Sequence, residues 1–171
     1  MKRLQIDGKW LLNMAVFSLV VIFLPAAVFA APQFGLGISI TEDGQVIHCP
    51  IKLNPNLRLE GSLGIHSYDR ENSGASDIDS IVLKFGGYMV QNVYEKTDIY
   101  YGGKVIYEKN DTGITDQNGY GLGPAFGFEY DITGHISVGG EAELYYIFHD
   151  RSGGDAKEYG TDSRVILRYY F

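Results

Sequence analysis

Three polar residues close together in the sequence are of the types that hydrolytic enzymes use. His135 and Ser137 are separated by one residue, and Glu141 follows four residues later. In such enzymes a histidine serves as the base, a serine as the nucleophile, and a carboxylate orients the imidazole. In a strand, however, a rise of about 3.3 Å per residue carries Glu141 well away from Ser137. We therefore expect a turn residue and two wall residues here, with catalysis as the alternative interpretation.

A larger set of charged residues alternates with apolar neighbours along much of the chain. Side chains alternate across a strand, so these charges share the face opposite to the apolar one. If the apolar face contacts lipid, the charges point inward and must pair, because an unpaired buried charge is costly. We expect a charge-balanced ion-pair network in which Arg164 or Arg168 contacts an acid on another strand. Its members are Arg58, Glu60, Lys84, Lys104, Glu129, Glu141, Glu143, Arg164 and Arg168.

The sequence predicts neither a cofactor nor a metal site. His48 and Cys49 are adjacent, so they point to opposite faces of a strand and cannot both bind one metal directly. Cys49 is the only cysteine, which excludes an internal disulfide. The net charge is −7 and no cluster of Lys and Arg occurs, so nucleic acid is not an expected partner.

Eight segments of alternating polar and apolar residues position these side chains. Clusters of Gly, Asn and Asp separate them, and no long helical period occurs, so each segment predicts a strand. After a tight hairpin at 43–44, the connections alternate between short turns and polar stretches of about ten residues. Transmembrane β-barrels show this asymmetry. The predicted strands are 33–41, 46–53, 57–66, 80–90, 98–108, 119–130, 135–149 and 161–171, and the polar stretches are 68–79, 109–118 and 150–160.

These elements predict an all-β, antiparallel, up-and-down transmembrane barrel with a polar, charge-paired interior. A soluble lipocalin-like barrel is the alternative, but it would need its apolar face inside. With the faces reversed, each Arg or Lys at the bilayer midplane would cost about 2–4 kcal/mol. Aromatic residues also fall near both ends of the apolar face, as two membrane interfaces require. These residues are Phe34, Tyr101, Tyr130, Tyr169 and Phe171 near the short turns, and Tyr107, Tyr120, Tyr146 and Phe148 near the polar stretches.

The first thirty residues have the pattern of a secretory signal peptide. Basic residues precede an apolar run that ends at Pro25, and 28–30 (Val-Phe-Ala) has the aliphatic–any–small pattern of a cleavage site. An uncleaved anchor over 10–31 is the alternative, since that length could span a bilayer. We expect residues 1–30 to be removed and 31–171 to form one barrel domain, exported to the outer membrane.

The C-terminal residues resemble the assembly signal of bacterial outer-membrane barrels. Val165, Leu167, Tyr169 and Phe171 alternate with Arg164 and Arg168, and the chain stops at the phenylalanine. The resemblance implies recognition by the barrel-assembly machinery. As a whole, the pattern resembles the small eight-stranded outer-membrane barrels of the OmpX and OmpA transmembrane-domain type. The segments 123–130 and 137–141 are also similar to those of uncharacterised outer-membrane β-barrel families.

The resulting hypothesis is a non-enzymatic outer-membrane protein with a structural or surface-interaction role. Its partners would be outer-membrane lipid, lipopolysaccharide and a surface ligand bound through 68–79, 109–118 and 150–160. His135, Ser137 and Glu141 resemble the His-x-Ser and Glu of outer-membrane lipid A deacylases, so a lipid A-modifying enzyme is one alternative. A narrow pore is another. Acidic residues of the polar stretches, here taken to include Asp162, could contact lipopolysaccharide phosphates through divalent cations.

Overall fold

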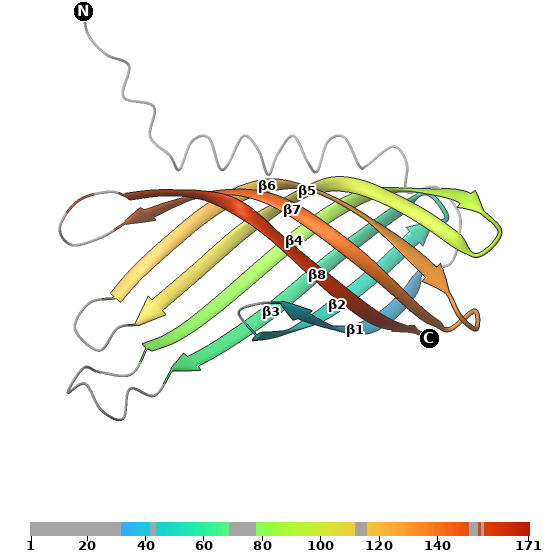
Figure 1. The fold of residues 1–171 in the computed structure, drawn as a ribbon, viewed down its shortest axis with the longest axis horizontal. Helices are drawn as coiled ribbons and strands as arrows, with labels where there is room; N and C mark the ends of the chain where they lie inside the picture. Colours follow the sequence, from blue (N-terminus) through green and yellow to red (C-terminus); the bar gives the residue numbers. More distant parts are fainter. Residues whose placement is uncertain (1–31, 42–43, 69–77, 112–115, 151–153, 155) are drawn as a thin grey trace, which may run out of the picture.

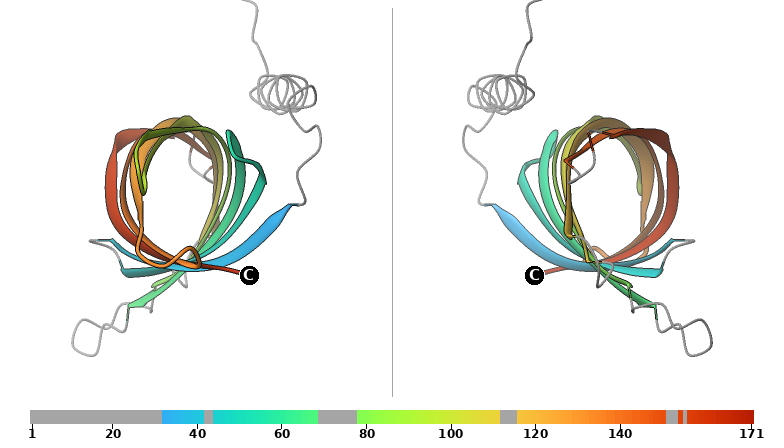
Figure 2. Two further views of the ribbon diagram at one scale, coloured as in Figure 1. Left: turned by 90° about the vertical axis from the view of Figure 1, so that its right-hand side faces the viewer. Right: turned by 90° about the vertical axis from the view of Figure 1, so that its left-hand side faces the viewer.

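Eight antiparallel strands form a closed barrel in the computed structural model, which describes residues 32–41, 44–68, 78–111, 116–150, 154 and 156–171. Each strand pairs with the next in the chain, and β1 pairs with β8 to close the sheet (Figures 1 and 2). The predicted signal segment 1–30 lies outside the described residues. The strands are β1 (Gln33–Thr41), β2 (Gly44–Asn54), β3 (Leu57–Tyr68), β4 (Ile78–Tyr94), β5 (Thr97–Asp111), β6 (Asp116–Asp131), β7 (Ile136–Asp150) and β8 (Ala156–Tyr170).

The predicted number, order and direction of the strands are confirmed, but two of the predicted loops are wrong. Most of 109–118 and 150–160 belongs to strands, because β5, β6, β7 and β8 extend toward one another and leave only 112–115 and 151–155 between them. Their backbone hydrogen-bond ladders continue beyond the apolar segments that sequence patterning detects. Only the stretch 68–79 keeps nearly its predicted length, and its residues 69–77 lie outside the described part of the chain. None of the helices among the described residues is long and apolar enough to cross a bilayer.

The outer face of the barrel is apolar, as predicted from the alternation. Along β1, the four apolar residues 34, 36, 38 and 40 are all exposed, whereas Gly37 and Ser39 between them are buried. Aromatic pairs mark both ends of the apolar band. The ring centres of Tyr169 and Phe171 lie 5.3 Å apart near the short turns. Those of Tyr146 and Phe148 lie 4.7 Å apart near the opposite rim. This face suits a lipid environment.

The barrel wall is much lower on one side. β1 has 9 residues and β2 has 11, whereas β4 to β8 have 15 to 17. The short β1–β2 hairpin lies between β3, which has 12 residues, and the longer β8 (Figure 1). Its turn is tight: Thr41 pairs with Gly44, whose φ of 135° favours glycine, and the Thr41 hydroxyl donates to the Gly44 carbonyl at 3.2 Å.

Candidate functional site

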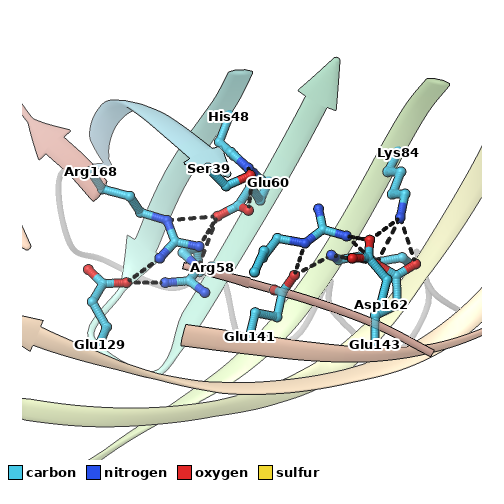
Figure 3. A network of polar contacts seen from close by, with 12 residues as sticks. Ser39, His48, Arg58, Glu60, Lys84, Glu129, Glu141, Glu143, Asp162 and Arg168 are labelled. Carbon is cyan, nitrogen blue, oxygen red and sulfur yellow. Dashed lines mark hydrogen bonds and ion pairs between the residues drawn. The ribbon is translucent and has the colours of Figure 1, made fainter. Parts of the chain in front are cut away.

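The charged residues inside the barrel form two clusters along its axis (Figure 3). Strand alternation places them there, because the residues on either side of them point mostly to the lipid face. Arg58 is an exception on one side, since Leu57 before it is buried. The turn-end cluster comprises Ser39, His48, Arg58, Glu60, Glu129, Ser137 and Arg168. The loop-end cluster comprises Lys84, Lys104, Glu141, Glu143, Asp162 and Arg164. All nine residues predicted for the ion-pair network line the interior.

Two arginines and two glutamates from three different strands make the centre of the turn-end cluster. Arg168 donates through Nε and Nη2 to Glu60 Oε2 at 3.1 and 2.9 Å, and through Nη1 to Glu129 Oε2 at 3.1 Å. Arg58 Nη1 donates to the same oxygen of Glu129 at 2.5 Å. All four side chains are buried. Charge-assisted hydrogen bonds of this kind are among the strongest that side chains form.

The second oxygen of each glutamate is also occupied. His48 Nδ1 lies 2.9 Å from Glu60 Oε1, and His48 Nε2 lies 2.8 Å from the Ser39 hydroxyl. Because an ionised carboxylate only accepts hydrogen bonds, Nδ1 carries the proton, and in the neutral ring Nε2 then accepts from Ser39. The Ser137 hydroxyl donates to Glu129 Oε1 at 2.7 Å. Both oxygens of each carboxylate therefore have a hydrogen-bond partner inside the barrel.

Three tyrosines complete the packing at this end. The guanidinium carbon of Arg58 lies 4.0 Å from the centre of the Tyr100 ring and 5.1 Å from that of Tyr88. Lys52 Nζ lies 4.0 Å above the ring of Tyr170. A cation over an aromatic face is attracted by the ring quadrupole. These contacts accommodate the cations where hydrogen-bond partners are lacking, as at Arg58 Nε and Nη2.

The loop-end cluster is centred on Glu143. Lys84 Nζ and Lys104 Nζ each donate to Glu143 Oε2 at 3.0 Å, and Arg164 Nη2 donates to the same oxygen at 2.9 Å. Lys104 also contacts Glu141 at 2.5 Å, and Arg164 Nε lies 3.5 Å from the same Glu141 oxygen. Asp162 accepts from Arg164 Nη2 and, at 3.4 Å, from Lys84. The prediction that Arg164 or Arg168 contacts Glu129, Glu141 or Glu143 is confirmed for both arginines.

Asp162 corrects one interpretation made from the sequence. The sequence pattern groups it with the solvated acidic residues of the last polar stretch, but β8 begins at Ala156 and carries Asp162 into the barrel. The nine predicted residues comprise five cations and four carboxylates, so they do not balance by themselves. Asp162 supplies the fifth carboxylate. Lys52, near the turn-end mouth and 3.6 Å from Glu129, is a further cation.

Sequence reasoning also missed several inward residues. His48, Ser39, Tyr88, Tyr100 and Tyr170 are buried partners in the turn-end cluster, but the predicted network includes none of them. A signal existed, since each alternates with lipid-facing neighbours. From the sequence, His48 is considered only together with Cys49, and the two are rejected as a shared metal site because they point to opposite faces. The two do lie on opposite faces, His48 buried and Cys49 exposed.

The structure does not bring the candidate catalytic residues together. His135 lies in the β6–β7 turn, where its Nδ1 is 2.9 Å from the backbone carbonyl of Tyr170. Ser137 donates to Glu129, while Glu141 belongs to the loop-end cluster. Among the described residues, no hydrogen bond joins His135 to Ser137 or Glu141. In the same part of the chain, no three His, Cys, Asp or Glu residues are grouped to hold a metal ion.

Two further sets of residues were predicted from the sequence: the assembly signal and the acidic residues of the rim. Val165, Leu167, Tyr169 and Phe171, the predicted assembly signal, are all exposed on the lipid face. Much of the acidic rim, including Asp69, Glu71, Asp77 and Asp155, lies outside the described residues. Of the rim acids that are described, Glu158 accepts hydrogen bonds from Tyr145 at 3.2 Å and from His149 at 3.0 Å.

The interior as a whole is filled by side chains. The turn-end cluster occupies one half and the loop-end cluster occupies the other (Figure 3). Tyr88, Tyr100 and Tyr170, all buried, pack beside the turn-end cluster. A cavity of about 80 Å³ lies beside Lys84, Asp162 and Arg164 at the top of the β1–β2 hairpin. An eight-stranded barrel has an interior just wide enough for side chains. The arrangement therefore holds the wall together and obstructs the axis.

Comparisons with known proteins agree with this architecture. The chain is similar in structure to Neisserial surface protein A (NspA), with a TM-score of 0.56 and 15% identity over 82% of this chain and 94% of that one. It is also similar to a major outer membrane protein from Thermus thermophilus, with a TM-score of 0.54 and 12% identity over 83% and 100%. At such identities the likeness shows the fold alone, that of a small outer-membrane β-barrel. No protein-family model matches the sequence, and no curated protein matches it.

Proposed function

We propose that the protein is a non-enzymatic outer-membrane barrel with a structural or surface-interaction role. The observation that carries this proposal is the filled interior, where five cations and five carboxylates pair across the barrel. Transport along the axis would require these pairs to separate, and breaking a buried pair typically costs about 3–5 kcal/mol. Function then resides on the outer surfaces.

The direct test is conductance. The purified protein is reconstituted into planar lipid bilayers, with a large porin as the positive control. We expect no stable conducting steps from the wild type. In Glu143→Ala the loop-end cations lose their shared carboxylate. We therefore compare the conductance of this variant, whose interior is less tightly paired, with that of the wild type. Stable steps from the wild type would favour a narrow pore and overturn the proposal.

The proposed location and the enzymatic alternative need separate measurements. Export through a cleaved 1–30 signal is tested by the N-terminal sequence of the protein purified from outer membranes, which we expect to begin at Ala31. Lipid A from cells with and without the protein is compared by mass spectrometry. We expect identical lipid A, because His135, Ser137 and Glu141 make separate contacts. Loss of an acyl chain that depends on Ser137 would establish a hydrolase instead.

The proposed partners are lipopolysaccharide and a surface ligand at the rim, and the barrel-assembly machinery during biogenesis. The rim is the part of the barrel that faces the exterior, and binding residues commonly lie on loops held by a rigid scaffold. Within the predicted stretch 68–79, the connection between β3 and β4 is 69–77, the longest between any two strands, so 69–77 is the first region to delete. We expect its deletion to leave the barrel folded and to reduce binding of a surface ligand.

A further inference from the structure

The short β1–β2 hairpin leaves a lateral notch in the barrel wall. Pairing of β8 with β1 ends at Val165–Ile40, and pairing of β3 with β2 ends at Gly64–Val46. β8 nevertheless continues to Ala156 beside β7, and β3 continues to Tyr68 beside β4. Within the described residues, 156–164 of β8 and 65–68 of β3 therefore have a strand partner on one side only. We call the space between these two edges the notch.

The notch lies within the apolar band of the wall. Tyr159 pairs with Tyr146 of the upper aromatic belt, and six residues along the strand separate it from Val165. At about 3.3 Å per residue, that is roughly 20 Å along the strand, which a tilt of about 40° reduces to roughly 15 Å along the barrel axis, against an apolar band about 25 Å tall. Backbone groups at this depth must be satisfied by protein, water or another polar partner. No described strand pairs with this edge of 156–164, which leaves its backbone groups to water or to a polar ligand.

The surfaces beside the notch differ from the rest of the lipid face. Below it, the outward residues of β8 are Val165, Leu167 and Tyr169, whereas beside it they are Lys157, Tyr159, Thr161 and Ser163, all exposed. Apolar side chains flank the notch on the neighbouring strands: Ile40 is 69% exposed and Ile65 is 64% exposed. Hydroxyl groups next to exposed aliphatic groups suit an amphiphile whose polar part enters the wall.

A polar cavity lies at the base of the notch. It has a volume of about 80 Å³ and is lined by Thr41, Val46, Ser62, Gly64, Val82, Lys84, Asp162 and Arg164. The lining itself has two cations and one carboxylate, and Glu143 just outside it balances their charge, since its Oε2 lies 3.0 Å from Lys84 Nζ and 2.9 Å from Arg164 Nη2. Arg164 is 4% exposed, and among the described residues its Nη1 has no hydrogen-bond partner. That unused guanidinium N–H can donate a charge-assisted hydrogen bond to an anionic oxygen.

We propose that this notch is a lipid-binding site, in which the phosphate of an outer-leaflet lipid contacts Lys84 and Arg164. The acyl chains lie against Ile40, Val165 and Ile65 on the outer face. The site rests on the proposed outer-membrane location, but not on the absence of a pore or of catalysis. Conductance and lipid binding are measured separately, so one proposal can fail while the other stands.

The test is lipid binding by purified protein folded in uncharged detergent, measured by native mass spectrometry. The probes are diphosphorylated lipid A, the same lipid with its phosphates removed, and inorganic phosphate. We expect one lipid A per barrel and at least about tenfold weaker binding without the phosphates, since hydrogen bonds to charged groups are worth about 1.5–3 kcal/mol. Equal binding of the two lipids would overturn the proposal. Equal binding of inorganic phosphate would also overturn it, by identifying a free anion as the ligand.

Two cavity variants, Ser62→Phe and Lys84→Met, locate the site. Ser62→Phe fills the cavity and keeps every charge, and Leu63→Phe adds the same ring on the outer face as a matched control. We expect Ser62→Phe and Lys84→Met to weaken lipid A binding about tenfold and Leu63→Phe to leave it unchanged. Wild-type affinity in folded Ser62→Phe would refute the site. If neither cavity variant folds, the comparison of the two lipids on wild-type protein still decides.

Discussion

Arg168 and Glu60 join two strands that are not neighbours in the barrel. Arg168 on β8 donates to Glu60 on β3 at 2.9 and 3.1 Å, although the short strands β1 and β2 lie between them in the wall. No backbone ladder links β3 to β8 among the described strands. This pair therefore ties together the two long strands that border the low side of the barrel.

Removing Arg168 should weaken the low side specifically. We expect Arg168→Met to lower the free energy of unfolding by about 3–5 kcal/mol, because Glu60 and Glu129 are left buried beside fewer cations. Hydrogen exchange should rise most in β1 and β2. Even exchange throughout the barrel would contradict this account.

Glu143 should matter more to stability than any acidic residue of the rim. It accepts from Lys84, Lys104 and Arg164, so Glu143→Ala leaves three buried or half-buried cations with fewer partners. We expect a loss of about 3–5 kcal/mol, measured by urea unfolding in lipid vesicles. Asp150→Ala, at an exposed strand end, is the control and should change stability by no more than about 0.5 kcal/mol. A smaller effect at Glu143 than at Asp150 would refute the ion-pair model.

Two glycines should differ sharply in their tolerance of a side chain. A Cβ at Gly86 would lie 2.7 Å from the Tyr88 hydroxyl oxygen, whereas a Cβ at Gly61 would meet nothing within 4 Å. We expect Gly86→Ala to destabilise the barrel by about 1–3 kcal/mol through overpacking, and Gly61→Ala to be nearly neutral. Urea midpoints compare the two. Equal midpoints would show that the Tyr88 ring can move aside, which would contradict its tight packing in the interior.

The closed barrel should resist sodium dodecyl sulfate until it is heated. All backbone pairing along the β1–β8 seam is internal, which favours retention of the fold in detergent. We expect unboiled protein to migrate differently from boiled protein on a gel. Identical migration, together with recovery of the protein from the periplasm, would contradict a membrane-spanning barrel.

Deleting Phe171 should impair assembly and leave export intact. The Phe171 amide donates to the Phe34 carbonyl at 2.9 Å, so this residue extends the seam between the first and last strands. Its ring also packs against Tyr169 on the lipid face. We expect the truncated protein to accumulate outside the outer-membrane fraction, as judged by immunoblotting. Leu167→Ile, which keeps the apolar face, is the control. Normal outer-membrane levels after deletion would remove the assembly role.

Sequence patterning predicted the barrel because one physical contrast, lipid against interior, is repeated in every strand. The segment 33–41 coincides with β1, and 135–149 differs from β7 by one residue at each end. The extensions of β5, β6 and β8 could not be predicted in this way. Those segments are rich in polar residues on both faces, so the polar–apolar alternation is absent while the backbone pairing continues.

Which charges meet could be predicted only in part. Alternation assigns a residue to the interior, but its partner depends on how the strands are staggered around the barrel. Glu141 and Arg164 are directly opposite on adjacent strands, so their contact follows from one hairpin. The contact between Arg58 and Glu129 crosses the interior from β3 to β6, and no local pattern specifies it. Asp162 was missed because it follows the acidic, polar residues of the preceding stretch.

The pairing of β1 with β8 has a consequence for the order of folding. These are the first and last strands, so their ladder joins segments more than a hundred residues apart in the chain. Contacts this distant in sequence form slowly, because loop closure must precede them. Until the seam closes, the nascent sheet has two bare edges, and Arg168 has not yet reached Glu60. An assembly factor that shields these edges would act before the final strand arrives, and closure would release the finished barrel.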